Sequence, residues 1–154
     1  MKPEEWAMLH GLLGTLFLMA FSVSFAELLA LTERGLRRLK LGISLMALSA
    51  WAMLATGTYV YIFYRAPMPE SARSRILAGP APWVHSVLME LKEFTGAFVP
   101  ALALLAMVLV FGWDQRLLGE GRLRHVLAIV LIAAMLWTLL PYGLGAYITK
   151  TASV

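Results

Sequence analysis

Four stretches of this chain contain no Asp, Glu, Lys or Arg: residues 6–26, 41–64, 94–113 and 125–149. They are 21, 24, 20 and 25 residues long. Crossing the roughly 30 Å hydrocarbon core of a bilayer takes about 20 apolar residues in a helix. A helix satisfies all its backbone hydrogen bonds within one segment, as lipid requires. The sequence therefore predicts an all-α, polytopic membrane protein with four transmembrane helices in an up-down bundle.

The four spans leave little chain for anything else. Of 154 residues, 60% are hydrophobic and only 14% are charged, about half the charge of a soluble domain. We expect one transmembrane domain over residues 1–154, with helices at about 6–32, 40–64, 83–113 and 123–149. Any chemistry then lies within the bundle or at its two faces.

Composition excludes several functions. The chain has no cysteine, which removes thiol redox chemistry and Cys-ligated iron–sulfur clusters. The formal charge of +4 comes from basic residues at the ends of apolar helices, where they meet lipid headgroups, so we expect no nucleic-acid partner. No Walker loop, zinc-protease motif or Ser–His–Asp arrangement is present.

Basic residues also predict how the bundle is oriented. The connections 33–40 and 114–124 hold seven Lys or Arg in 19 positions, whereas the tails and the 66–82 loop side hold six in 39. The denser side is expected to be cytoplasmic. Both termini are then predicted on the non-cytoplasmic side.

Two histidines near that outer side are candidate haem ligands. Gly14 follows His10 by one helical turn, and Gly96 lies on the helical face of His85 and Met89. Imidazoles on facing helices, beside small residues, are a common way to hold b-type haem in a bundle. Small residues also allow two helices to approach closely without any cofactor. Helix packing therefore stays open as an alternative explanation of Gly14 and Gly96.

The depths of the two histidines differ. His10 precedes Glu33 by 23 residues, and His85 precedes Asp114 by 29. Six residues correspond to about 9 Å of helical rise, which tilt or a kink at Pro100 would have to remove. Ligation by His10 with Met89 is therefore an alternative to the His10–His85 pair.

The third span begins with a charged segment, Glu90, Lys92 and Glu93. Charges inside a membrane usually face a cavity or a partner, which suggests a polar or proton relay beside a quinone or histidine. The simpler alternative places all three at the headgroup level. Glu27 and His125 are likewise expected at the inner interface.

Three functions are consistent with these features. The leading hypothesis is a small b-type cytochrome or a haem-carrying subunit of an electron-transfer complex, with haem between the first and third helices. The second is a non-catalytic structural subunit that packs against other membrane subunits or a second copy of itself. The third is a quinone- or lipid-modifying enzyme that uses the His and Glu residues. The sequence thus favours an electron-transfer or structural subunit over an enzyme, and the enzyme hypothesis stays open.

Overall fold

The computed structural model describes residues 2–152 and is helical over nearly all of them. Four helical spans are long and apolar enough to cross a membrane. The elements in chain order are α1 (Pro3–Leu29), α2 (Glu33–Tyr64), α3 (Ala72–Ala78), η1 (Val84–Met89), α4 (Glu90–Gly96), α5 (Val99–Gly112), α6 (Asp114–Gly119) and α7 (Gly121–Thr151). The predicted all-α fold with four spanning helices is confirmed, and it fits an integral, multi-pass membrane protein.

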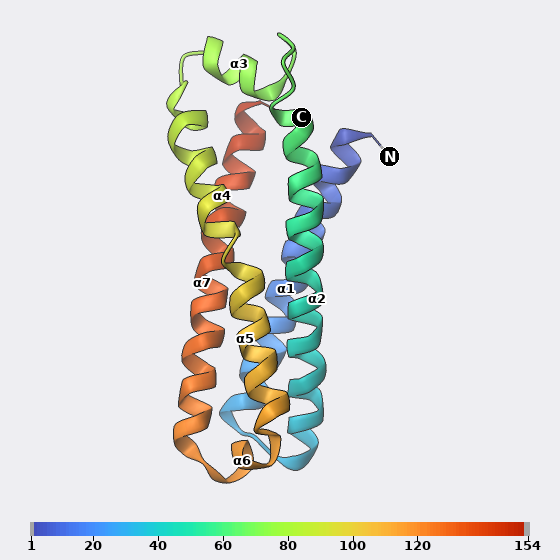
Figure 1. Ribbon diagram of the computed structural model, residues 1–154, viewed down its shortest axis with the longest axis vertical. Coiled ribbons are helices and arrows are strands. Elements are labelled where there is room, and N and C mark those ends of the chain that lie inside the picture. The colour runs from blue at the N-terminus through green and yellow to red at the C-terminus, as the bar shows by residue number, and fades with distance from the viewer. Residues whose placement is uncertain (1, 153–154) are drawn as a thin grey trace.

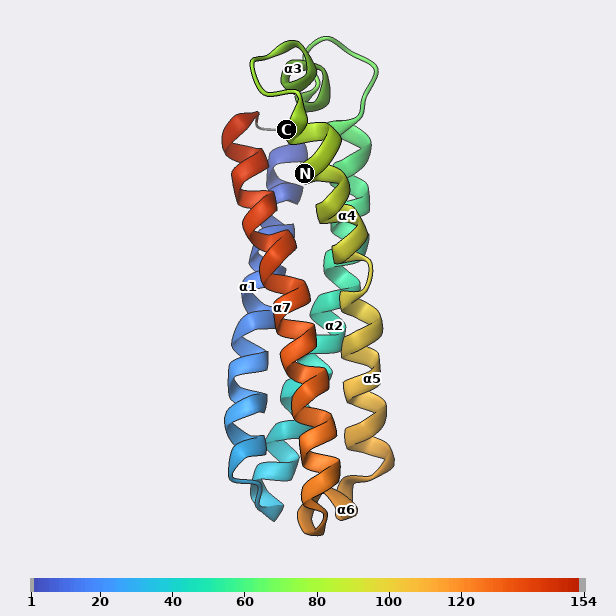
Figure 2. The ribbon, with the colours of Figure 1, turned by 90° about the vertical axis from the view of Figure 1, so that its left-hand side faces the viewer.

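The spans alternate in direction, as an up-down bundle requires (Figure 1). Both chain ends lie near the end that carries α3, while the α1–α2 turn and α6 lie at the opposite end (Figures 1 and 2). We call these the outer and inner ends, after the predicted orientation. The short inner connections make α1 and α2 antiparallel neighbours along their length.

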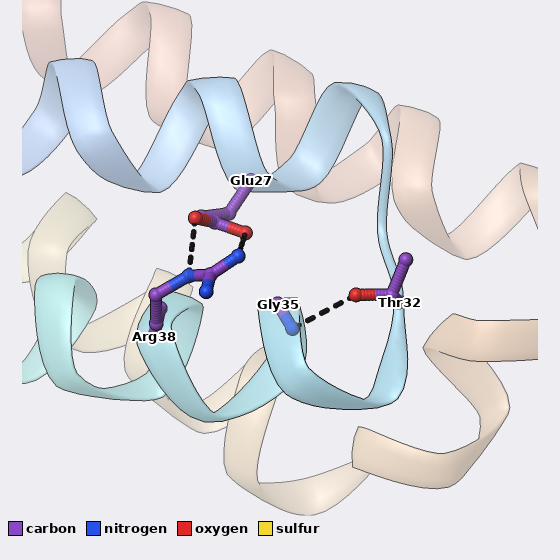
Figure 3. Close-up of polar contacts among 4 residues, drawn as sticks. All are labelled: Glu27, Thr32, Gly35 and Arg38. Carbon is purple, nitrogen blue, oxygen red and sulfur yellow. Dashed lines mark hydrogen bonds and ion pairs between the residues drawn. The ribbon is translucent and has the colours of Figure 1, made fainter.

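The inner turn between α1 and α2 is fixed by polar contacts (Figure 3). The Thr32 hydroxyl accepts a hydrogen bond of 3.0 Å from the Gly35 amide, which caps the new helix. Arg38 donates to both carboxylate oxygens of Glu27, at 2.5 and 3.0 Å. Because of this cap, α2 begins at Glu33 rather than near residue 40, and it includes the basic segment at its start.

The third span covers Val84–Gly112, within the predicted helix at about 83–113, and it is interrupted inside those bounds. It opens with the π-helical turn η1, continues as α4, and breaks at residues 97–98 before α5. Pro100 lacks the N–H that would bond to the carbonyl of Gly96, and its ring crowds that carbonyl. The resulting offset between α4 and α5 is visible in Figure 1.

Two hydrophobic cores hold the bundle together. The larger fills the inner half, where fully buried Phe17, Leu39, Met46 and Leu131 meet. A smaller outer core joins Tyr64 and Ile76 to residues of η1 and the end of α7. Many large apolar side chains outside these cores are exposed, as expected of helices surrounded by lipid.

Candidate functional site: an outer cavity

Between the two cores the helices separate and enclose a cavity. In the inner half α2 packs on α5, but in the outer half α4 and η1 pack on α7 instead. Pro141 interrupts the hydrogen-bond ladder of α7, and a side chain on Gly96 would reach it at 4.0 Å. Pro141 of the continuous helix α7 and the interruption of the third span at residues 97–98 thus lie at the level of the cavity, whose lining includes Ala97 and Pro141.

The cavity has a volume of about 550 Å³ and takes its lining from all four spans. That volume lies within the range of sites for cofactors and other small molecules. Most lining residues are apolar. The polar or titratable ones are His10, Thr58, Tyr61, Tyr64, Lys92, Glu93, Thr138, Tyr142 and Thr149.

His10 reaches the cavity from α1 with one ring nitrogen already engaged. Its Nδ1 lies 3.0 Å from the carbonyl oxygen of Met53 and 3.3 Å from the Thr56 hydroxyl. A carbonyl only accepts hydrogen bonds, so in the neutral ring the proton belongs on Nδ1. Nε2 then carries the free lone pair, and no residue of the described chain is seen to bond to it.

Gly57 allows this placement of the imidazole. A Cβ at residue 57 would lie 2.8 Å from Cε1 of His10, closer than real side chains approach. The ring therefore rests directly on the backbone of α2. Gly57 is not among the residues predicted from the sequence, because a glycine inside an apolar run does not reveal which side chain faces it.

The charged head of the third span divides into two parts. Lys92 and Glu93 line the cavity, with Lys92 half-buried and Glu93 exposed, while Glu90 is exposed and lies outside the lining. The stem of Lys92 packs on Gly145, where a Cβ would lie 3.0 Å from its Cε. Within residues 2–152, Lys92 is near the Glu93 carboxylate but forms no ion pair of salt-bridge length.

Tyr61 connects Glu93 to the outer end of the bundle. Its hydroxyl accepts a hydrogen bond of 2.9 Å from Arg65 and lies near the Glu93 carboxylate. Because the guanidinium supplies the donor, the hydroxyl proton is free to point toward the carboxylate. From the sequence, Tyr61 is only one of several aromatics near the outer interface, since its partner Glu93 comes from another span.

His85 lies outside the cavity lining and both its ring nitrogens are occupied. Arg73 Nε donates to His85 Nε2 at 3.1 Å, and Nδ1 lies 3.0 Å from the Tyr64 hydroxyl. Because Nε2 accepts, the proton is on Nδ1 and points at Tyr64. The side chain is only 6% exposed. His85 therefore fastens α3 and α2 to η1.

Of the remaining residues predicted from the sequence, some line the cavity and one lies at a contact between helices. Met89 and Gly96 line the cavity with His10. Gly14 does not, because the ring of Tyr142 fills its open side, where a Cβ on Gly14 would lie 2.8 Å from the ring. The Tyr142 hydroxyl lies 3.0 Å from that of Thr15. Gly14 therefore brings α1 and α7 together.

The two interfacial residues lie at the inner end. Glu27 pairs with Arg38, and His125 is exposed with Nδ1 2.7 Å from the carbonyl of Gly121. Nearby, the Asp114 carboxyl receives a hydrogen bond from Lys40 at 2.7 Å and another from the Gln115 amide. These contacts hold the pKa of Asp114 below its usual value.

The fold and site thus define a four-span helical bundle with a mostly apolar cavity of about 550 Å³ in its outer half. Comparison of the chain with protein-family models, with curated proteins and with solved structures finds no match. The properties of the cavity itself therefore carry the functional proposal.

Proposed function

We propose that this protein binds b-type haem in the outer cavity, with His10 as an axial ligand, and transfers electrons in the membrane. The observation that carries the proposal is the orientation of His10. A hydrogen bond from Nδ1 to a backbone carbonyl fixes the tautomer that leaves Nε2 available to a metal, and metal-binding histidines commonly make such a bond. The cavity beside it is mostly apolar and large enough for a cofactor.

Met89 is the second ligand in this proposal. Its thioether side chain lies in the lining that also contains His10, and a His–Met pair is an established haem ligation. The sequence-predicted partner, His85, would first have to leave Tyr64 and Arg73. When bound, haem would supply a one-electron redox centre. The protein's part is to orient that centre and exclude water from it.

A visible absorption spectrum tests the proposal. Protein purified in detergent from haem-replete cells should show a Soret band and redox-sensitive α and β bands. His10→Ala should remove the bands, and Met89→Leu should shift them while reducing the occupancy. His85→Asn is the matched control and should retain the spectrum. Loss of colour only in the His85 variant would assign the ligand to His85 instead, and colourless wild-type protein would reject haem.

A quinone is the second candidate, favoured by the Arg65–Tyr61–Glu93 connection. It links the outer end of α2 to a carboxylate in the cavity, which is an arrangement that can pass protons to or from a quinol. Organic extraction of colourless protein should then yield about one quinone per chain, and less from Glu93→Gln. If the purified protein contains neither haem nor quinone and several other chains co-purify with it, the structural-subunit alternative is supported.

A further inference from the structure

A second hollow lies at the inner end, between the start of α2 and α6. Its volume is about 520 Å³, and charged side chains dominate its lining, namely Glu33, Arg34, Arg37, Lys40 and Asp114. It is separated from the outer cavity by the large hydrophobic core. It therefore has no part in the proposed haem site and does not depend on it.

At the inner end, basic residues outnumber acidic ones even after the ion pairs are counted. The connections hold seven basic residues, and the neighbouring acids are Glu27, Glu33, Asp114 and Glu120. Three ion pairs, Arg38–Glu27, Lys40–Asp114 and Arg116–Glu120, use three of each. Four basic residues and one acid are left over. Two of those basic residues, Arg34 and Arg37, are exposed on the wall of the hollow and form no ion pair within the described chain.

The hollow also borders the apolar surface of the bundle. The Nζ atom of Lys40 lies over the ring of Phe111, 5.3 Å from the ring centroid. Phe111 is 51% exposed. Phe111 belongs to α5, one of the spans that lipid surrounds. A molecule with its charged group between Arg34 and Arg37 could therefore extend an apolar part along α5.

We propose that the hollow between α2 and α6 binds the headgroup of an anionic phospholipid. The guanidinium groups of Arg34 and Arg37 hold the phosphate, since guanidinium matches phosphate oxygens in charge and hydrogen-bond geometry. The ion pair of Lys40 with Asp114 closes one wall. The acyl chains follow the exposed face that includes Phe111.

Native mass spectrometry of the detergent-purified chain measures this binding directly. Titration with phosphatidylglycerol and with phosphatidylcholine of the same acyl chains should show preferential retention of phosphatidylglycerol. The double variant Arg34→Gln/Arg37→Gln should lower its apparent affinity about thirtyfold. If that variant does not fold, each single substitution should lower the apparent affinity about fivefold.

The matched control is Arg122→Gln/Arg124→Gln, which removes the same charge from the same end but outside the hollow. It should change the affinity less than about twofold. An equal loss in both double variants would mean diffuse attraction and would overturn the site. Glycerol phosphate should not displace the lipid. Full displacement by it, or by inorganic phosphate, would show a soluble-anion site and would also overturn the proposal.

Discussion

At the scale of single residues, glycines decide where the functional side chains lie. Gly57 supports the ring of His10, Gly145 the stem of Lys92, and Gly14 the ring of Tyr142. Each contact joins two spans. In each, the glycine has no side chain, so a large side chain from the other span can lie against the glycine backbone. Gly143, on the same helix as Gly145, has open space around the position of a Cβ and lies outside the cavity lining.

Substitution of Gly57 should therefore displace His10. We expect Gly57→Val to reduce the Soret absorbance per mole of protein several-fold, because the new side chain occupies the space of the imidazole. Overpacking of this kind should also destabilise the fold by about 1–3 kcal/mol. Gly143→Val is the control, since it adds the same volume outside the cavity lining, where no atom lies within 4 Å of the new Cβ. Equal spectra from both variants would contradict the placement of His10.

The Lys40–Asp114 pair should make a pH-dependent contribution to stability. The pKa of Asp114 is lowered, chiefly by the hydrogen bond from Lys40, so the folded state favours the ionised carboxylate. That contribution is fully present above the ordinary Asp value of about 3.9 and is lost as pH falls through the lower folded pKa. Melting temperatures between about pH 3 and 7 should therefore fall less at the acid end in Asp114→Asn than in wild type. An identical pH dependence would contradict the prediction.

At the scale of elements, α1 and α2 form the closest pair of helices in the bundle. Ser24 bonds to the carbonyl of Ala20 at 2.7 Å and is fully buried against Gly42. A Cβ on Gly42 would overlap the Ser24 hydroxyl oxygen and lie 3.4 Å from the Ala20 carbonyl. Small residues of this kind let membrane helices pack backbone to backbone.

A large side chain at residue 42 should separate this pair. We expect Gly42→Leu to lower the free energy of unfolding by about 1–3 kcal/mol, seen as a lower midpoint of tryptophan-monitored melting in detergent. Gly112→Leu is the matched control because nothing lies within 4 Å of its Cβ position, and it should melt close to wild type. Similar losses in the two variants would argue against the close α1–α2 contact.

At the scale of the whole molecule, the bundle has two ends of different character. The outer end carries both termini and α3, and the inner end carries the dense basic segments (Figure 1). The structure places α3 and the inner turns at opposite ends, whatever membrane surrounds them. Which end faces the cytoplasm is a prediction from the basic residues.

Cysteine labelling can test that orientation cleanly, since the chain has no cysteine of its own. Glu70 and Gln115 are both exposed and lie in the connections at opposite ends. In intact cells a membrane-impermeant maleimide should label Glu70→Cys, and it should label Gln115→Cys only after permeabilisation. The reverse pattern would invert the predicted orientation while leaving the bundle unchanged.

The sequence by itself determined the spans and their alternation. An apolar run without charge has one stable form in lipid, a helix that crosses it, and short connections make successive helices antiparallel. It also indicated the interfacial level of Glu27 and His125, because charge density changes there. The ends of the helices depended on local contacts, such as the Thr32 cap that starts α2 at Glu33.

Only the tertiary structure decided which polar residues share a site. Helical spacing places residues on a face of their own helix, but the rotation of one helix against another depends on packing between glycines and large side chains. Thus His10 and Lys92 line the cavity, His85 is held outside it by Tyr64 and Arg73, and Glu90 is exposed. Pro141 of α7 and the interruption of the third span before Pro100 lie beside that cavity, and no count of residues along one span could reveal it.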